Sequence, residues 1–270
     1  MRVAETDRTR WEATQRSLWS RRPDDWSQLA EPQNLQLFSD ALDAAGVTAQ
    51  TDLLDVGCGS GLALALAAQR GAHRSGIDIS GPLLEVARGR VPGADLREGG
   101  MDVLPFPDSS FDVVLGINAL QFAADAASAL HEITRVLRPG GRLAVGGFAR
   151  PETCQSTALH LAMESLVPPA QHDDHAPYAL AAPGALERAL ADAGLAVTQD
   201  REQPGDWRYG DLDQALRGVL SSAGGTRAIG LAGEERVRAV LIEALEPFRT
   251  DSGEFVMHNR FRLTVAERAA

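Results

Sequence analysis

The chain alternates between short strand-like segments and amphipathic stretches. The segments 52–56, 75–79, 94–97, 111–117 and 142–147 have strand length and are bounded by turn residues. Apolar residues fall on one helical face in the stretches 61–70 and 81–89. They do so again in the stretch that follows Asp125, a residue suited to cap a helix. The alternation predicts an α/β fold with a mostly parallel, doubly wound sheet and helices on both faces. Ligands should then bind beyond the carboxyl ends of the strands.

The C-terminal half is less regular. One helix is expected at 152–166, followed by a polar loop at 168–178. The loop is too irregular for a routine crossover between strands, so we expect it to cover a site. Helices are expected at 183–193 and 211–220 and in an amphipathic stretch around Leu241, with a strand at 195–201. In the last segment, 255–265, apolar residues alternate with His258, Arg260 and Arg262, which predicts a half-exposed antiparallel strand near a sheet edge.

The first fifty residues predict a helical layer. Helices are expected at 9–19 and 35–45, with a loop at 21–26 between them, and three of the four tryptophans fall here. These aromatic side chains either pack the layer onto the sheet or form a lid whose faces close over a flat or cationic ligand.

A glycine turn connects the first strand to its helix. The run Leu54-Asp55-Val56-Gly57-Cys58-Gly59-Ser60-Gly61 lets a ligand approach bare backbone next to the N–H groups of a helix N-terminus. The second strand ends in Asp78, where a carboxylate can accept hydrogen bonds from both hydroxyls of a ribose. The sequence therefore predicts a nucleoside site.

Composition narrows the function further. A net charge of −11 over 270 residues argues against a nucleic-acid partner. The chain has no lysine, which excludes Schiff-base chemistry and a phosphate-loop lysine. Cys58 and Cys154 lie far apart without metal-ligand spacing, so we expect a reduced, cytoplasmic protein without a metal. No apolar run suggests a signal peptide or a membrane span.

Four motifs occur together in order. They are the glycine turn, Gly76-Ile77-Asp78, the run from Leu104 to Asp112, and the run from Arg135 to Arg142. Over residues 50–148 the chain closely resembles the class I S-adenosylmethionine-dependent methyltransferases, in the branch that acts on small molecules. The resemblance implies a Rossmann-like sheet of seven strands with an antiparallel last strand. It also implies one domain, divided into an N-terminal helical cap (1–50), a cofactor-binding core (51–148), a substrate-covering insertion (149–182) and a C-terminal completion of the sheet (183–270).

The resemblance also assigns cofactor contacts. The methionine part of S-adenosylmethionine, and of its product S-adenosylhomocysteine, would lie against the turn and be oriented by Asp55, while Asp78 would bind the ribose. The family often carries an acid at the position of Gly100 that reaches the adenine amino group, so this contact is expected from Asp102 or is lost. The full set of expected cofactor residues is Asp55, Gly57, Cys58, Gly59, Asp78, Ile79, Met101, Asp102 and Asn118.

The expected reaction is methyl transfer to an oxygen, nitrogen or carbon of a small acceptor, such as a flat or polyketide-like secondary metabolite. In-line displacement needs mainly positioning, and a base only if the acceptor arrives protonated. The candidate bases are His172, His175 and Tyr178, with His160, Asn118 and Gln121 as further polar candidates; the run His172 to His175 is not expected to hold a metal. Two alternatives stay open, a non-methylating cofactor-binding protein of cyclase or regulatory type and a nicotinamide oxidoreductase. A homodimer also stays open.

Overall fold

A seven-stranded sheet organises the computed structural model, which describes residues 5–167 and 182–269. The strand order is β3-β2-β1-β4-β5-β9-β6, and β9 runs antiparallel to both of its neighbours. This order confirms the predicted α/β fold, mostly parallel with an antiparallel last strand. The strands are β1 (Asp52–Val56), β2 (His73–Asp78), β3 (Asp95–Glu98), β4 (Phe111–Ile117), β5 (Leu137–Phe148), β6 (Leu195–Pro204) and β9 (Arg260–Arg268).

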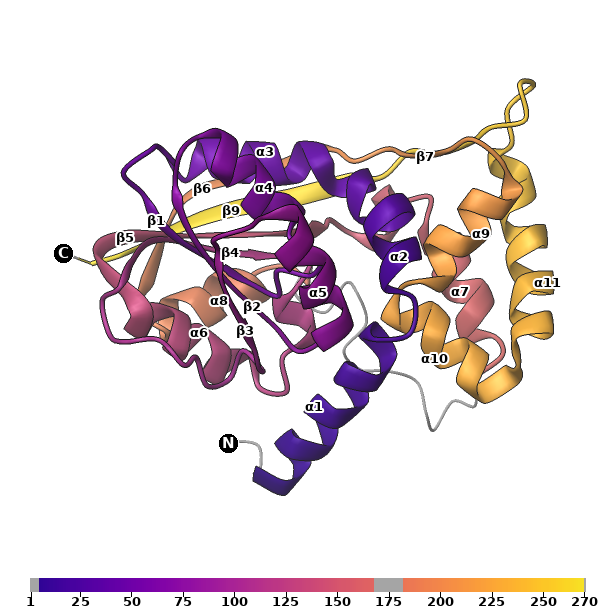
Figure 1. Cartoon of the computed structure of the whole chain (residues 1–270). Helices are drawn as coiled ribbons and strands as arrows, with labels where there is room; N and C mark the ends of the chain where they lie inside the picture. The colour runs from indigo at the N-terminus through magenta and orange to yellow at the C-terminus, as the bar shows by residue number, and fades with distance from the viewer. Residues whose placement is uncertain (1–4, 168–181, 270) are drawn as a thin grey trace.

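Helices cover both faces of the sheet (Figure 1). The helices α3 (Leu35–Ala44), α4 (Leu62–Gln69) and α5 (Gly81–Arg90) share one apolar core with Leu53 of β1. The helices α6 (Ala126–Val136) and α8 (Ala185–Asp192) share a second core with Leu54. Because successive residues of a strand point to opposite faces, β1 contributes to both cores. The predicted cap on α6 is present, since the Asp125 carboxylate accepts the Ala127 N–H at 3.1 Å.

A helical unit with its own apolar core lies at one end of the molecule (Figure 1). Its buried residues include Leu216, Val237 and Leu241. Its elements are α7 (Thr157–Glu164), α9 (Leu212–Leu220), α10 (Ala223–Ala232), α11 (Glu234–Leu245), the 3-10 turn η7 (Glu246–Phe248) and the two-stranded sheet of β7 (Trp207–Tyr209) and β8 (Phe255–Met257).

The N-terminal segment bridges this helical unit and the sheet. Helix α1 (Glu5–Trp19) packs on α10, α2 (Pro23–Asp25) on α5, and the π-helical turn η1 (Trp26–Ala30) on α9. The 3-10 turn η2 (Glu31–Asn34) then leads into α3. The predicted loop at 21–26 is therefore wrong, because Pro23 starts a helical turn there that continues into η1.

The last predicted strand is two strands, and the second of them is antiparallel and lies next to the edge strand, as predicted. Residues 255–257 pair with β7, whereas β9 lies between β5 and β6. Asn259 separates the two strands; it is buried and its Oδ1 accepts the Ser156 N–H at 2.9 Å. The polar residues that alternate with the apolar ones along β9 form ion pairs with the neighbouring strand, as Arg262 does with Asp200 at 2.8 Å.

Two helix predictions also need correction. The single helix expected at 152–166 is a 3-10 turn, η4 (Pro151–Thr153), followed by α7, which begins only at Thr157 because Asn259 holds the chain at Ser156. Helix α10 was not predicted. Its glycines hide the helical pattern, and Ser222 caps it by accepting the Gly225 N–H at 3.1 Å.

Candidate active site

The glycine turn after β1 is a surface that side chains cannot occupy. Gly57 has a φ of +76°, and a Cβ there would lie 2.6 Å from the Cβ of Ala119. The N–H groups of Gly57 and Cys58 both donate to the Ile77 carbonyl, at 2.8 and 3.1 Å. These bonds fix the turn to the end of β2 and keep its backbone bare toward the space beyond the strands.

Asp78 links the glycine turn to the loop after β2. Its Oδ2 accepts the Gly59 N–H and its Oδ1 accepts the Ser80 N–H, each at 2.8 Å. Burial raises the pKa of Asp78 to about 6, although the N–H groups of Ser80 and Gly59 oppose the rise. The Ile79 N–H also lowers this pKa, so three backbone N–H groups hold the carboxylate and part of its accepting capacity is left for a ligand hydroxyl.

Two further carboxylates lie at the turn. Asp55 is buried, and burial raises its pKa to about 8 with added repulsion from Glu31 and Asp78. Glu31 is 2% exposed and accepts hydrogen bonds from the Ser60 hydroxyl and the Arg90 guanidinium. Sequence reasoning missed Glu31 and Arg90, because they meet across 59 positions of the chain and neither belongs to a local motif.

The other end of the site lies beyond β3 and β4. Asp102 is buried and accepts the Asp125 N–H at 3.1 Å. Asn118 follows β4 with a φ of +52°, and its N–H donates to the Gly146 carbonyl at 2.7 Å. The Asn118 side-chain nitrogen donates to Asn34 at 3.0 Å, while its Oδ1 has no partner among the described residues.

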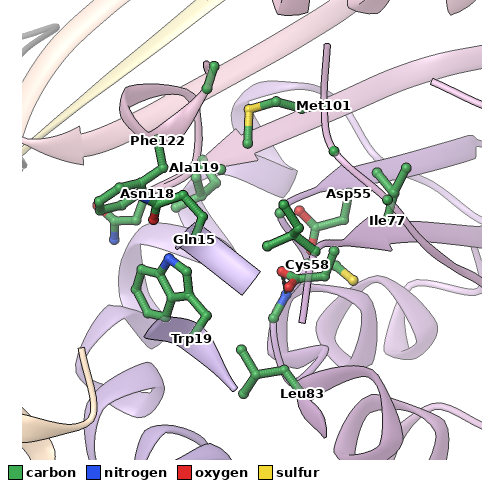
Figure 2. Close-up of a pocket in the computed structure, with 18 of the residues that line it drawn as sticks. Gln15, Trp19, Asp55, Cys58, Ile77, Leu83, Met101, Asn118, Ala119 and Phe122 are labelled. Carbon is green, nitrogen blue, oxygen red and sulfur yellow. Dashed lines mark hydrogen bonds between the residues drawn. The ribbon is translucent and has the colours of Figure 1, made fainter. Parts of the chain in front are cut away.

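All the expected cofactor residues line one cavity of about 900 Å³. Figure 2 shows Asp55 and Cys58 on one side of it and Trp19, Asn118 and Phe122 on the other. Helix α1, which no motif had marked, contributes a wall of residues: Trp11, Glu12, Gln15 and Trp19.

A second cavity of about 1110 Å³ adjoins the first. Trp19 packs edge-on against Trp26 and Phe122, with ring centroids 4.8 and 5.4 Å apart. The lining is largely aromatic and apolar, and the Trp207 Nε1 and the Ser156 Oγ in it have no hydrogen-bond partner among the described residues. The wall shared by the two cavities consists of Trp19, Trp26, Asn34, Asn118 and Phe122.

The candidate bases are only partly placed. His160 and Gln121 line the second cavity. His172, His175 and Tyr178 lie outside the described residues. Within residues 5–167 and 182–269, no cluster of histidine, cysteine and acidic side chains is suited to a metal, and no helix is long and apolar enough to cross a membrane.

Known proteins match the site-bearing core. Residues 54–145 match the family model of a methyltransferase domain. A demethylmenaquinone methyltransferase of Tropheryma whipplei is 38% identical over 128 residues, covering 46% of this chain and 52% of that relative. The 27-O-demethylrifamycin SV methyltransferase of Amycolatopsis mediterranei is 40% identical over 104 residues, covering 36% of this chain and 38% of that relative. The chain therefore spans only about half, or less, of these curated relatives.

The likeness of fold extends further than the likeness of sequence. A crystal structure from Bacillus halodurans, assigned as a methyltransferase, superposes with a TM-score of 0.58 at 17% identity, covering 86% of this chain and 99% of that one. Family model and relatives agree that residues 54–145 form a methyltransferase domain, and the sheet order is that of the class I S-adenosylmethionine-dependent methyltransferase fold.

Proposed function

We propose that the protein transfers a methyl group from S-adenosylmethionine to a small, largely apolar acceptor. The observation that carries the proposal is the pair of cavities that share the wall around Trp19 and Asn118. The first has the bare glycine turn and a strand-end acid that suit a nucleoside, and the second is large and aromatic. When bound, the cofactor supplies an activated methyl group with a good leaving group.

The residues of the first cavity suit that cofactor. Gly57 and Gly59 line the cavity without side chains, and Asp78 is held by backbone N–H groups with accepting capacity left for a ribose hydroxyl. Asp55 would orient the amino acid part, and Ile79, Met101 and Asp102 would line the base. The remaining work of the chain is to position the acceptor and exclude water, for which the aromatic shared wall is suited.

The second cavity supports the proposed class of acceptor. Its aromatic lining favours a flat or polycyclic molecule. The Trp207 N–H and the Ser156 hydroxyl, which have no hydrogen-bond partner among the described residues, offer a few polar contacts. The relatives' names fit such molecules, since they specify demethylmenaquinone and 27-O-demethylrifamycin SV. A secondary metabolite is therefore the proposed substrate. A base, where needed, is proposed among His172, His175 and Tyr178.

Calorimetric titration with S-adenosylhomocysteine, S-adenosylmethionine and NAD tests the cofactor. We expect micromolar binding of both sulfur nucleosides and none of NAD. Asp78→Ala should weaken binding at least about tenfold, because hydrogen bonds to a charged group contribute about 1.5–3 kcal/mol. Asp192→Ala, an exposed acid at the end of α8, is the matched control and should bind normally. Binding of NAD instead would move the protein to the oxidoreductases.

Product mass tests the transfer itself. The protein is incubated with S-adenosylmethionine and demethylmenaquinol or 27-O-demethylrifamycin SV, and the products are weighed by mass spectrometry. Methylation adds one methylene to the acceptor. Conversion of any acceptor without a mass change, with the cofactor intact, would instead support the cyclase-type alternative.

A further inference from the structure

The space beside Gly100 is occupied by a side chain from another element, whereas its own backbone φ is ordinary. Gly100 is not among the residues with positive φ, so any side chain could adopt its backbone. A Cβ at Gly100 would nevertheless lie 2.6 Å from the Oε1 of Glu12 and 3.0 Å from its Cδ. The missing side chain leaves room for a carboxylate that arrives from α1, 88 positions earlier in the sequence.

Neighbouring contacts hold the part of α1 that carries Glu12. The Trp11 indole N–H, one residue before it, donates to the Phe122 carbonyl at 2.9 Å. One helical turn later, Arg16 pairs with Glu98 at 3.4 Å. Helix α1 is thus bound both to the loop after β4 and to the end of β3, and Glu12 between these anchors lines the first cavity.

Glu12 has more free accepting capacity than its neighbour Asp102. Among the described residues Glu12 makes no hydrogen bond and no ion pair, although it is half-buried. Asp102 is instead bonded to the N–H groups of Asp125 and Ala124, so it holds the chain between η3 (Leu120–Phe122) and α6. A carboxylate accepts hydrogen bonds and donates none when ionised, so Glu12 suits a ligand group with an N–H at its edge.

We propose that Glu12 accepts a hydrogen bond from the 6-amino group of adenine and so selects the base of the cofactor. This inference rests on the proposed function. Ile79 and the loop at 99–102 line the same cavity as Asp78, and the Glu12 carboxylate lies beside Gly100 in that loop, so a base whose ribose is bound at Asp78 would have Glu12 within reach of its edge. The N-terminal helix then supplies a specificity-determining residue, and cofactor binding requires α1 to be docked.

A binding cycle tests Glu12 without any turnover. S-adenosylhomocysteine is compared calorimetrically with its 6-deamino analogue, in which hydrogen replaces the amino group. The wild type should prefer the amino compound about tenfold or more, since a hydrogen bond to a charged group contributes about 1.5–3 kcal/mol. Glu12→Ala should lose that preference by weakening only the amino compound. Glu5→Ala, an exposed acid on the same helix, is the control and should keep it.

A second, independent test introduces a carboxylate at position 100 and measures the binding of S-adenosylhomocysteine. Gly100→Asp in the wild type should weaken binding of S-adenosylhomocysteine, because the new side chain collides with Glu12. In the Glu12→Ala background the same change should restore binding, because the space is free and an acid is again present. Equal weakening of both ligands by Glu12→Ala would show a packing role and overturn the inference. Failure of the wild type to bind S-adenosylhomocysteine would overturn the proposed function itself.

Discussion

Asp55 is a carboxyl group buried beside two other carboxyl groups. Burial, with repulsion from Glu31 and Asp78, raises its pKa to about 8. Between the ordinary pKa of about 4 and this value, the folded chain binds a proton that the unfolded chain does not. The contribution of Asp55 to the free energy of unfolding is therefore fully present below pH 4 and is lost as the pH rises through 8.

The ligand-free protein should accordingly become less stable between pH 6 and pH 8. Asp55→Asn keeps the shape of the side chain and removes its titration, so the fall should be smaller in the variant. Melting temperatures by calorimetry at several pH values measure the difference. Parallel pH profiles for the wild type and Asp55→Asn would show that Asp55 titrates in its ordinary range.

Gly57 and Gly93 both have positive φ but differ in their surroundings. Gly57→Ala should cost the backbone strain of about 1–2 kcal/mol plus a collision with Ala119, of about 1–3 kcal/mol. Gly93 has a φ of +84° with no atom within 4 Å of a Cβ, so Gly93→Ala should show strain alone. Urea unfolding of both variants measures the two costs. Equal losses of stability in the two variants would mean that the turn relaxes around Ala119 at little cost.

At the scale of elements, local signals were predictable and long-range pairings were not. Asp78 and the Asp125 cap stand at ends of elements that the hydrophobic pattern marks, so their positions follow from a few neighbouring residues. Glu12 and Glu31 reach the site from distant helical segments, and such contacts leave no periodic trace in the sequence. The break at Asn259 was missed for a related reason, because Met257 and Phe261 keep the same alternation on both sides of it.

The Glu31–Arg90 pair joins the N-terminal segment to α5. Arg90→Ala should destabilise the fold by about 2 kcal/mol, because it leaves a buried carboxylate without its counter-charge. Adding Glu31→Gln should recover part of the loss, since the uncompensated charge is then gone. Arg88→Ala on the same helix removes an exposed pair with Glu85 and should cost at most about 0.5 kcal/mol. Chemical denaturation of the wild type and of these three variants measures the free energies of unfolding. Equal losses of stability in Arg90→Ala and Arg88→Ala would contradict the bridging role of Arg90.

At the scale of the whole molecule, the sheet and its loops contribute lining residues to the first cavity, and the helical unit contributes lining residues to the second. Residues of β1, β2 and β4 and their loops line the first cavity, whereas Met163, Tyr209 and Val219 of the helical unit line the second. The motifs predicted the first cavity because its contacts are largely backbone turns and strand ends. The second cavity depends on aromatic packing between segments far apart in sequence, so the sequence indicated its aromatic residues but not the cavity itself.

The crowding of Glu31, Asp55 and Asp78 has a further consequence for the proposed methyl transfer. A sulfonium methyl donor carries a positive charge, and the thioether left after transfer carries none. Negative surroundings therefore favour the donor over the spent product, and more strongly above pH 8, where Asp55 is ionised. The same buried charges that weaken the ligand-free fold would promote release of the product and keep turnover moving forward.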